Sequence, residues 1–312
     1  MEDAVSERSA EPLLPSGVKV PFEEIDSALN RNSDDEARRA AGRALTGTIV
    51  VAGPPGRLTE AANALTELPD VGLRAVLISY GDNPAPTVHV SRQTVALEGL
   101  RPEYLNNAVA ALRLSSLPTL VWWRGGRTEA LTGLAALSDR LVLDAEDPTE
   151  VWKSVPMLAE RTAVSDLRWT RLTRWRALMA HFFDMPDVCA AASSFRVLRI
   201  EGTDRFMAQL YAGWLASTLH WPGDVKPELR DLPGTSPIES VVLGDGGQEL
   251  TLRLADNHSC VETTVRVRGL APATRMVSLG DQGLAALVGE ELRIRAHDLA
   301  FERAVAALKG FV

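Results

Sequence analysis

Residues 46–68 read TGTIVVAGPPGRLTEAANALTEL and determine the fold class of the first half of the chain. The β-branched run at 46–52 is typical of a buried strand, and GPPG at 53–56 predicts a tight turn. Residues 57–68 have a helical pattern. A buried strand that leads directly into a helix is the repeating unit of a parallel α/β sheet. This stretch therefore predicts an α/β domain.

The sequence around this stretch repeats the alternation of strands and helices. Apolar strands are expected at 73–80, 118–123 and 140–145, and helices at 21–30, 101–114 and 147–160. Because strands that alternate with helices build a sheet covered on both faces, we expect a mostly parallel sheet flanked by helices.

The second half has a different strand pattern. In the stretches 249–254 and 260–268, apolar and polar residues alternate strictly, which indicates antiparallel strands with one face in water. A long helix is expected at 203–221, with Thr203 as its cap, and two helices close the chain. The fold class is thus α/β in two domains, the second with a mixed or antiparallel sheet and packing helices. We expect the domains at 21–164 and 165–312, after a flexible arm at 1–20.

Composition excludes several classes of function. The 312 residues carry 33 basic and 41 acidic side chains, a net charge of -8, whereas nucleic-acid binders normally show a basic excess. The sequence has no apolar run of about 18 residues, so no membrane span is expected. The acidic first twenty residues do not resemble a signal peptide. We therefore expect a cytoplasmic protein that binds neither nucleic acid nor membrane, with Cys189 and Cys260 as reduced thiols.

The segment 165–176, SDLRWTRLTRWR, combines four arginines with two tryptophans. If Ser165 caps a single helix over 166–184, Trp169 and Trp175 fall on its buried face and Arg171 and Arg174 on its solvent face. The remaining arginines, Arg168 and Arg176, lie in or beside the apolar face. A guanidinium in that position needs partners, so ion pairs between the two domains, a partner interface and an anion site all remain open for this pair.

A second aromatic cluster ends the expected strand at 118–123. Trp122, Trp123 and Arg124 lie at its carboxyl end, where open α/β sheets bind ligands or partners. Core packing and a contact surface both fit these residue types. If Trp123 is exposed, Trp123→Ala should spare folding and weaken a partner complex.

The sequence contains no catalytic motif. The GPPG turn fits neither a phosphate-binding loop nor a dinucleotide fingerprint, and Pro54 and Pro55 lack the amide donors of an anion site. No close metal-ligand spacing occurs among the histidines. Glu290 and Glu291 are expected to be solvated surface charges. We therefore expect no catalytic residue, no cofactor and no metal.

The block from 165 to 176 resembles the signature of the OpcA family, the glucose-6-phosphate dehydrogenase assembly proteins of cyanobacteria and actinobacteria. The matching residues are Asp166, Leu167, Trp169, Arg171, Leu172, Thr173, Trp175 and Arg176. Arg174 departs from the proline expected in many relatives. The resemblance implies a non-enzymatic partner that binds glucose-6-phosphate dehydrogenase and promotes its active oligomer.

An alternative function, as an enzyme rather than a partner protein, stays open. It is a sugar-phosphate- or nucleotide-binding enzyme of carbohydrate metabolism, with an anion near Arg57, near Arg124 or between Arg168 and Arg176.

Overall fold

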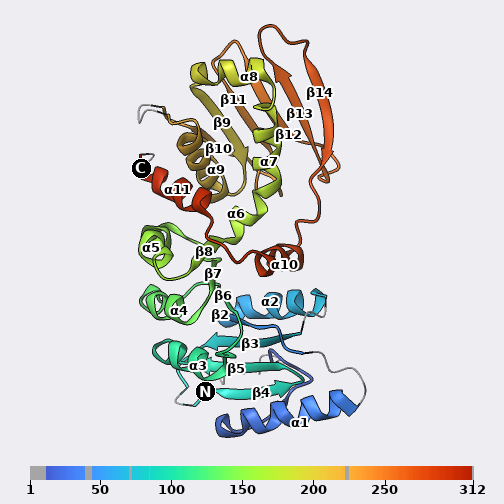
Figure 1. The fold of residues 1–312 in the computed structure, drawn as a ribbon, viewed down its shortest axis with the longest axis vertical. Coiled ribbons are helices and arrows are strands. Elements are labelled where there is room, and N and C mark those ends of the chain that lie inside the picture. Colours follow the sequence, from blue (N-terminus) through green and yellow to red (C-terminus); the bar gives the residue numbers. More distant parts are fainter. Residues whose placement is uncertain (1–11, 39–43, 70–71, 84, 222–224, 311–312) are drawn as a thin grey trace, which may run out of the picture. The chain divides into compact units, whose positions relative to one another are not determined.

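The computed structural model describes residues 12–38, 44–69, 72–83, 85–221 and 225–310 (Figure 1). It divides into two compact units, residues 1–141 (unit 1) and 142–312 (unit 2). The domain boundary expected after residue 164 stays a prediction. Most of the arm expected at 1–20 lies outside the described residues, although residues 18–19 belong to a strand.

An eight-stranded sheet has the order β1-β4-β5-β3-β2-β6-β7-β8; the strands from β1 to β6 lie in unit 1, and β8 lies in unit 2. Its strands are β1 (Val18–Lys19), β2 (Gly47–Gly53), β3 (Leu73–Tyr80), β4 (Thr87–Ser91), β5 (Thr94–Leu100), β6 (Thr119–Trp123), β7 (Arg140–Leu143) and β8 (Ala163–Asp166). β2 is parallel to β3 and β6, and β3 is parallel to β5, whereas β4 is antiparallel to β5 and β1. The division between the units falls inside β7. The mostly parallel sheet predicted from the sequence is confirmed.

β2 is the centre of this sheet and leads directly into the GPPG turn. Every residue of β2 is buried, as its uninterrupted apolar run predicts. From β2 the chain builds β3 and β5 on one side, and then returns to build β6 on the other. The carboxyl ends of β2 and β6 therefore form a topological switch point, the place where open α/β sheets bind ligands.

The helices of unit 1 are α1 (Ile25–Arg38), α2 (Pro55–Glu67), α3 (Leu105–Leu112) and α4 (Leu131–Leu137), with short 3-10 turns at Phe22–Glu24, Pro102–Tyr104 and Thr128–Ala130. α2 packs against β2 and β3, and α1 packs against β4. Pro54 and Pro55 begin α2, where a missing amide proton costs least.

Unit 2 contains a six-stranded mixed sheet in the order β10-β9-β11-β12-β13-β14. Its strands are β9 (Val197–Gly202), β10 (Glu228–Asp231), β11 (Ser240–Gly244), β12 (Glu249–Leu254), β13 (Cys260–Arg266) and β14 (Ala273–Ser278). Only the β9 and β10 pair among these is parallel. The predicted mixed or antiparallel sheet is confirmed.

The helices of unit 2 are α5 (Thr149–Ala159), α6 (Leu167–Arg171), α7 (Thr173–Phe182), α8 (Pro186–Ala191), α9 (Arg205–Thr218), α10 (Leu284–Arg293) and α11 (Leu299–Ala307), with 3-10 turns at Ala192–Ser194 and Leu308–Gly310. α9 packs against β9 and β10, α7 packs against β12, and α11 packs against α9. Figure 1 shows β14, in orange, at the outer edge of this sheet, where its residues are mostly exposed.

Three details of the predicted helices are wrong. The helix expected over 166–184 is two helices, because at Leu172 the amide donates to the carbonyls of Arg168 and Trp169 (3.1 Å each) and α7 starts anew at Thr173. Ser165 does not cap it, since it belongs to β8; the cap is Asp166. Similarly, Asp204 rather than Thr203 caps α9. In each case a carboxylate at the next position bonds the open amides.

Within the described residues, no helix combines the length and the apolar character that crossing a membrane requires.

Candidate functional site

The switch point of unit 1 is occupied by a side chain of the chain itself. Arg124 follows β6 directly, and its side chain is only 3% exposed. Its Nη1 donates to the carbonyl oxygen of Arg57 (2.6 Å), and its Nη2 donates to Glu60 Oε2 (2.8 Å). Arg57 Nη1 donates in return to the carbonyl oxygen of Arg124 (3.3 Å). The turn after β2 and the end of β6 are thus held together by two arginines.

Glycines allow this close approach. A Cβ on Gly53 would lie 2.9 Å from the Arg124 Cβ, which is too close for any larger residue without a shift. Gly126 has a φ of +118°, and a Cβ there would lie 2.3 Å from Cε2 of Tyr80. Gly53 therefore serves the packing against Arg124, and Gly126 serves the packing against Tyr80. A dinucleotide would need this same space for its pyrophosphate.

The aromatic residues predicted beside Arg124 lie in the core of unit 1. Trp122 is 0% exposed and Trp123 is 2% exposed. The Arg124 guanidinium carbon lies 4.7 Å from the centroid of the Trp122 ring, a cation–π distance. Trp123→Ala was expected to spare folding only if Trp123 is exposed, and Trp123 is buried. A role of Trp122, Trp123 and Arg124 in partner contacts stays a prediction, but in this structure all three side chains are enclosed.

The segment 165–176, called the signature segment from here, joins the elements of unit 2, and its first anchor is Asp166. This carboxyl group is 0% exposed. Oδ1 accepts from the amide of Arg168 (2.8 Å), and Oδ2 accepts from Nε1 of Trp152 on α5 (3.0 Å). Burial raises the pKa of Asp166 to about 6, against the lowering effects of Arg168 and the two hydrogen bonds. Asp166 thus links β8, α5 and α6.

Arg168 makes contacts on both sides of the signature segment. Its Nη1 and Nη2 donate to the carbonyl oxygens of Ala145 (2.8 Å) and Glu146 (2.9 Å), and its Nε donates to Asp204 Oδ2 (3.2 Å). The other oxygen of Asp204 accepts the first amides of α9, from Phe206 (2.9 Å) and Met207 (3.0 Å). All of these groups belong to unit 2. Arg168 therefore attaches α9 to the loop that precedes α5.

Trp169 and Arg176 form a second anchor. Nε1 of Trp169 donates to Oδ2 of Asp298 (2.6 Å), the residue that caps α11. The guanidinium carbon of Arg176 lies 3.6 Å from the Trp169 ring centroid. Burial lowers the pKa of Arg176 to about 10, although the charges of Asp298, Tyr211 and Glu290 raise it. Arg176 is thus held by an aromatic face of its own unit.

Glu291 is a buried acid that the sequence did not reveal. It was expected to be solvated, but it is 2% exposed on α10. Its Oε1 accepts from Ser165 Oγ (2.9 Å) and from the hydroxyl of Thr170. These hydroxyl groups satisfy the carboxyl group in place of water. Because they lie more than a hundred residues earlier in the chain, only the fold could identify them.

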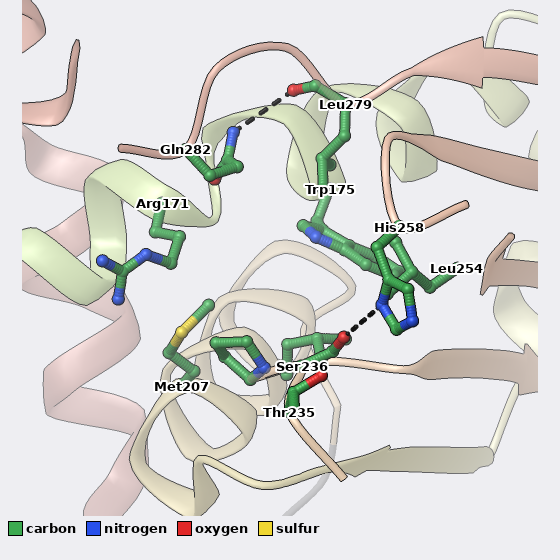
Figure 2. Close-up of a pocket in the computed structure, with 11 residues that line it drawn as sticks. Arg171, Trp175, Met207, Thr235, Ser236, Leu254, His258, Leu279 and Gln282 are labelled. Carbon is green, nitrogen blue, oxygen red and sulfur yellow. Dashed lines mark hydrogen bonds between the residues drawn. The ribbon is translucent and has the colours of Figure 1, made fainter. Parts of the chain in front are cut away.

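A pocket also adjoins the signature segment, on the side of Arg171 and Trp175 (Figure 2). Arg171 was expected to face solvent, yet it is only partly exposed and lines this pocket. Ser236 Oγ and His258 Nδ1 lie 2.9 Å apart at the pocket. Among the described residues, no group of three or more His, Cys, Asp and Glu side chains could hold a metal ion.

Comparison with known proteins finds one family that this chain resembles. The family model for the C-terminal domain of the glucose-6-phosphate dehydrogenase subunit matches residues 162–305. A Synechocystis sp. relative named OxPP cycle protein OpcA is 26% identical over 286 residues, which cover 76% of this chain and 60% of the relative. The chain is similar to the OpcA family, and residues 162–305 match the model of its C-terminal domain. The matched residues include the whole block on which the sequence resemblance rested, so that resemblance is confirmed.

Other OpcA proteins match shorter stretches. The relative from Synechococcus elongatus is 31% identical over 140 residues, 41% of this chain and 32% of the relative. The relative from Nostoc punctiforme is 27% identical over 128 residues, 38% of this chain and 28% of the relative. The alignments thus span at most 60% of the length of these OpcA relatives.

Solved structures with a similar fold are distant. An oxidoreductase from Bacillus cereus is 9% identical, with a TM-score of 0.48, over 85% of this chain and 95% of that protein. Levoglucosan dehydrogenase, in complex with NADH and L-sorbose, is 10% identical, with a TM-score of 0.45, over 86% of this chain and 91% of that protein. Neither likeness bears on the activity of this chain.

Proposed function

We propose that this chain is a non-catalytic assembly factor and allosteric activator of glucose-6-phosphate dehydrogenase, acting in the cytoplasm in the oxidative pentose phosphate pathway. The dehydrogenase is named in the family model that residues 162–305 match, and the pathway in the OpcA relatives. In this proposal the chain binds the dehydrogenase and favours its active oligomer.

The observation that carries the non-catalytic part of the proposal is the position of Arg124. Its guanidinium, bonded to the Arg57 carbonyl and to Glu60, occupies the switch point between β2 and β6. A hydride-transferring enzyme of this topology would need that crevice for its cofactor. A chain that fills the crevice with its own side chain is better suited to act through contact with a partner.

The alternative enzyme needs an arginine that is available to a substrate anion. Each of the four arginines named for it has contacts within its own unit. Arg57 and Arg124 bond each other, Arg168 bonds Asp204 and two carbonyls, and Arg176 lies against Trp169. These contacts favour the assembly factor over the alternative.

The test uses this chain and the glucose-6-phosphate dehydrogenase of the same organism. The two proteins are mixed and separated by size-exclusion chromatography, and turnover of the dehydrogenase is measured with and without the chain. We expect a shared peak, a larger dehydrogenase oligomer and faster turnover. Heat-unfolded chain at the same concentration is the control for crowding. Separate peaks together with unchanged kinetics would contradict the proposal.

A further inference from the structure

The pocket beside the signature segment is a cavity within unit 2 that the proposed function does not use. It has a volume of about 450 Å³. Pockets for small molecules typically measure about 300–1,000 Å³. Its walls come from the signature segment, from α9, from the loop before β11 and from the turn between β12 and β13. The cavity therefore has the size of a metabolite site and is built from segments distant in sequence.

The floor of the pocket is apolar and firmly packed. Trp175, Met207 and Ile238 line it, and each is at most 3% exposed. The carbonyl of Trp175 accepts from the hydroxyl of Tyr211 (3.2 Å), which fixes this part of α7. A rigid floor of an indole ring and aliphatic side chains suits a flat, apolar ligand body.

Arg171 gives the pocket a positive charge. Within the described part of the chain its side chain has no hydrogen bond or ion pair, whereas Arg168 in the same helix has four polar contacts. No Asp or Glu of the described residues lines the pocket, although the chain as a whole has a net charge of -8. A guanidinium at an apolar cavity without an acidic neighbour favours a carboxylate or phosphate ligand.

The pocket also has polar groups, of which Ser236 and His258 lie across it from Arg171. Figure 2 shows Arg171 on one side and His258 with Ser236 on the other. His258 has a φ of +52°, a strained conformation for a residue other than glycine, and the Ser236 hydroxyl fixes its ring through Nδ1. Oε1 of Gln282 is buried and has no hydrogen-bond partner among the described residues, while its Nε2 donates to the Leu279 carbonyl (3.2 Å). An unpaired buried acceptor and a strained, oriented imidazole are both features of a binding site.

We propose that this pocket binds a small organic acid with a flat, apolar body. The acid group pairs with Arg171, the body packs on Trp175 and Met207, and a polar substituent reaches His258 or Gln282. A sugar phosphate fits this lining less well, because most of its ring hydroxyls would lose water against Trp175, Met207 and Ile238, and the few polar groups of the pocket could pair with only some of them. The proposal does not depend on the partner of the chain.

The test is isothermal titration calorimetry of the purified chain with three probes. Phenylpyruvate carries both the acid and the flat body, 2-phenylethanol carries the body alone, and glucose 6-phosphate carries the charge on a polar body. We expect phenylpyruvate to bind at one site per chain, more tightly than either other probe. Absent saturation at millimolar phenylpyruvate, or tighter binding of glucose 6-phosphate, would overturn the proposal.

Two matched variants locate the site. Arg171→Gln should weaken phenylpyruvate by about tenfold or more, since a charge-assisted hydrogen bond is lost, and should leave 2-phenylethanol unchanged. Arg174→Gln, three residues along in an exposed position outside the pocket, should leave both affinities unchanged. If Arg171→Gln does not fold, Thr235→Trp at the exposed rim serves instead and should abolish binding by filling the pocket. Unchanged phenylpyruvate binding in a folded pocket variant, or equal losses in Arg171→Gln and Arg174→Gln, would overturn the assignment.

Discussion

The two regions rich in tryptophan and arginine have similar compositions, but in one the arginine is buried and bonded, and in the other it lines a pocket. At the switch point of unit 1, Arg124 turns inward, is 3% exposed and bonds the Arg57 carbonyl and Glu60. In the signature segment of unit 2, the tryptophans are equally buried, but Arg171 lines an open pocket. The difference lies in what the neighbouring elements offer to the guanidinium. Arg124 has acceptors within reach and fills the crevice, whereas Arg171 has no hydrogen-bond or ion-pair partner among the described residues and lines a pocket.

The largest expected losses of stability come from substitutions of the tryptophans, which are buried in both regions. Trp123→Ala and Trp175→Ala should each lower the free energy of unfolding by about 3–5 kcal/mol, because each removes a large buried side chain. Denaturant unfolding of each variant measures this. A loss below about 1 kcal/mol at Trp123 would show that its side chain is not part of the core of unit 1.

The next largest effect is the pH dependence of the stability that Asp166 contributes. Its folded pKa of about 6 exceeds the usual 3.8, so the folded state holds this proton more tightly than the unfolded state does. The contribution to stability is therefore full below about pH 4 and is lost as the pH rises through about 6. We expect the stability of wild type relative to Asp166→Asn to fall by on the order of 3 kcal/mol across this range.

Urea unfolding of the two proteins at several pH values measures this difference. Because both proteins share every other titrating group, the difference isolates Asp166. If the relative stability of wild type rises with pH, then Arg168 and the two hydrogen bonds outweigh burial and the carboxyl group is charged in the folded state.

Smaller losses of stability are expected from the ion pair at the switch point, and they should differ between its two partners, Arg124 and Glu60. Arg124→Met removes hydrogen bonds from a buried guanidinium and should cost about 1–3 kcal/mol. Glu60→Gln changes a carboxylate that is 64% exposed and should cost less than about 1 kcal/mol. Thermal unfolding of both variants gives the ranking. A larger loss in Glu60→Gln would mean that the carboxylate, rather than the two backbone carbonyl contacts, holds the crevice closed.

Local patterns in the sequence predicted most of the fold. The apolar run of β2, the GPPG turn and the alternation in β12 and β13 each specify their element directly, because strand burial and turn geometry depend on neighbouring residues. The OpcA signature could likewise be identified from its own residues.

The features that escaped prediction depend on contacts between distant residues. A helical wheel over 166–184 assumes one continuous cylinder, so it missed the break at Leu172, and it could not show that Arg171 lines a pocket. Glu291 was taken for a surface charge because its partners, Ser165 and Thr170, belong to another part of the chain. The pocket has the same origin, since its polar groups come from separate loops.

Whether Arg124 closes the crevice is tested most directly by isothermal titration calorimetry of this chain alone with NADP⁺ and with NAD⁺. If Arg124 closes the switch point of unit 1, neither dinucleotide should bind at millimolar concentration, as the proposed action through a partner requires. Saturable binding of either dinucleotide in the micromolar range, weakened by a substitution in the GPPG turn, would contradict the account and favour an enzyme.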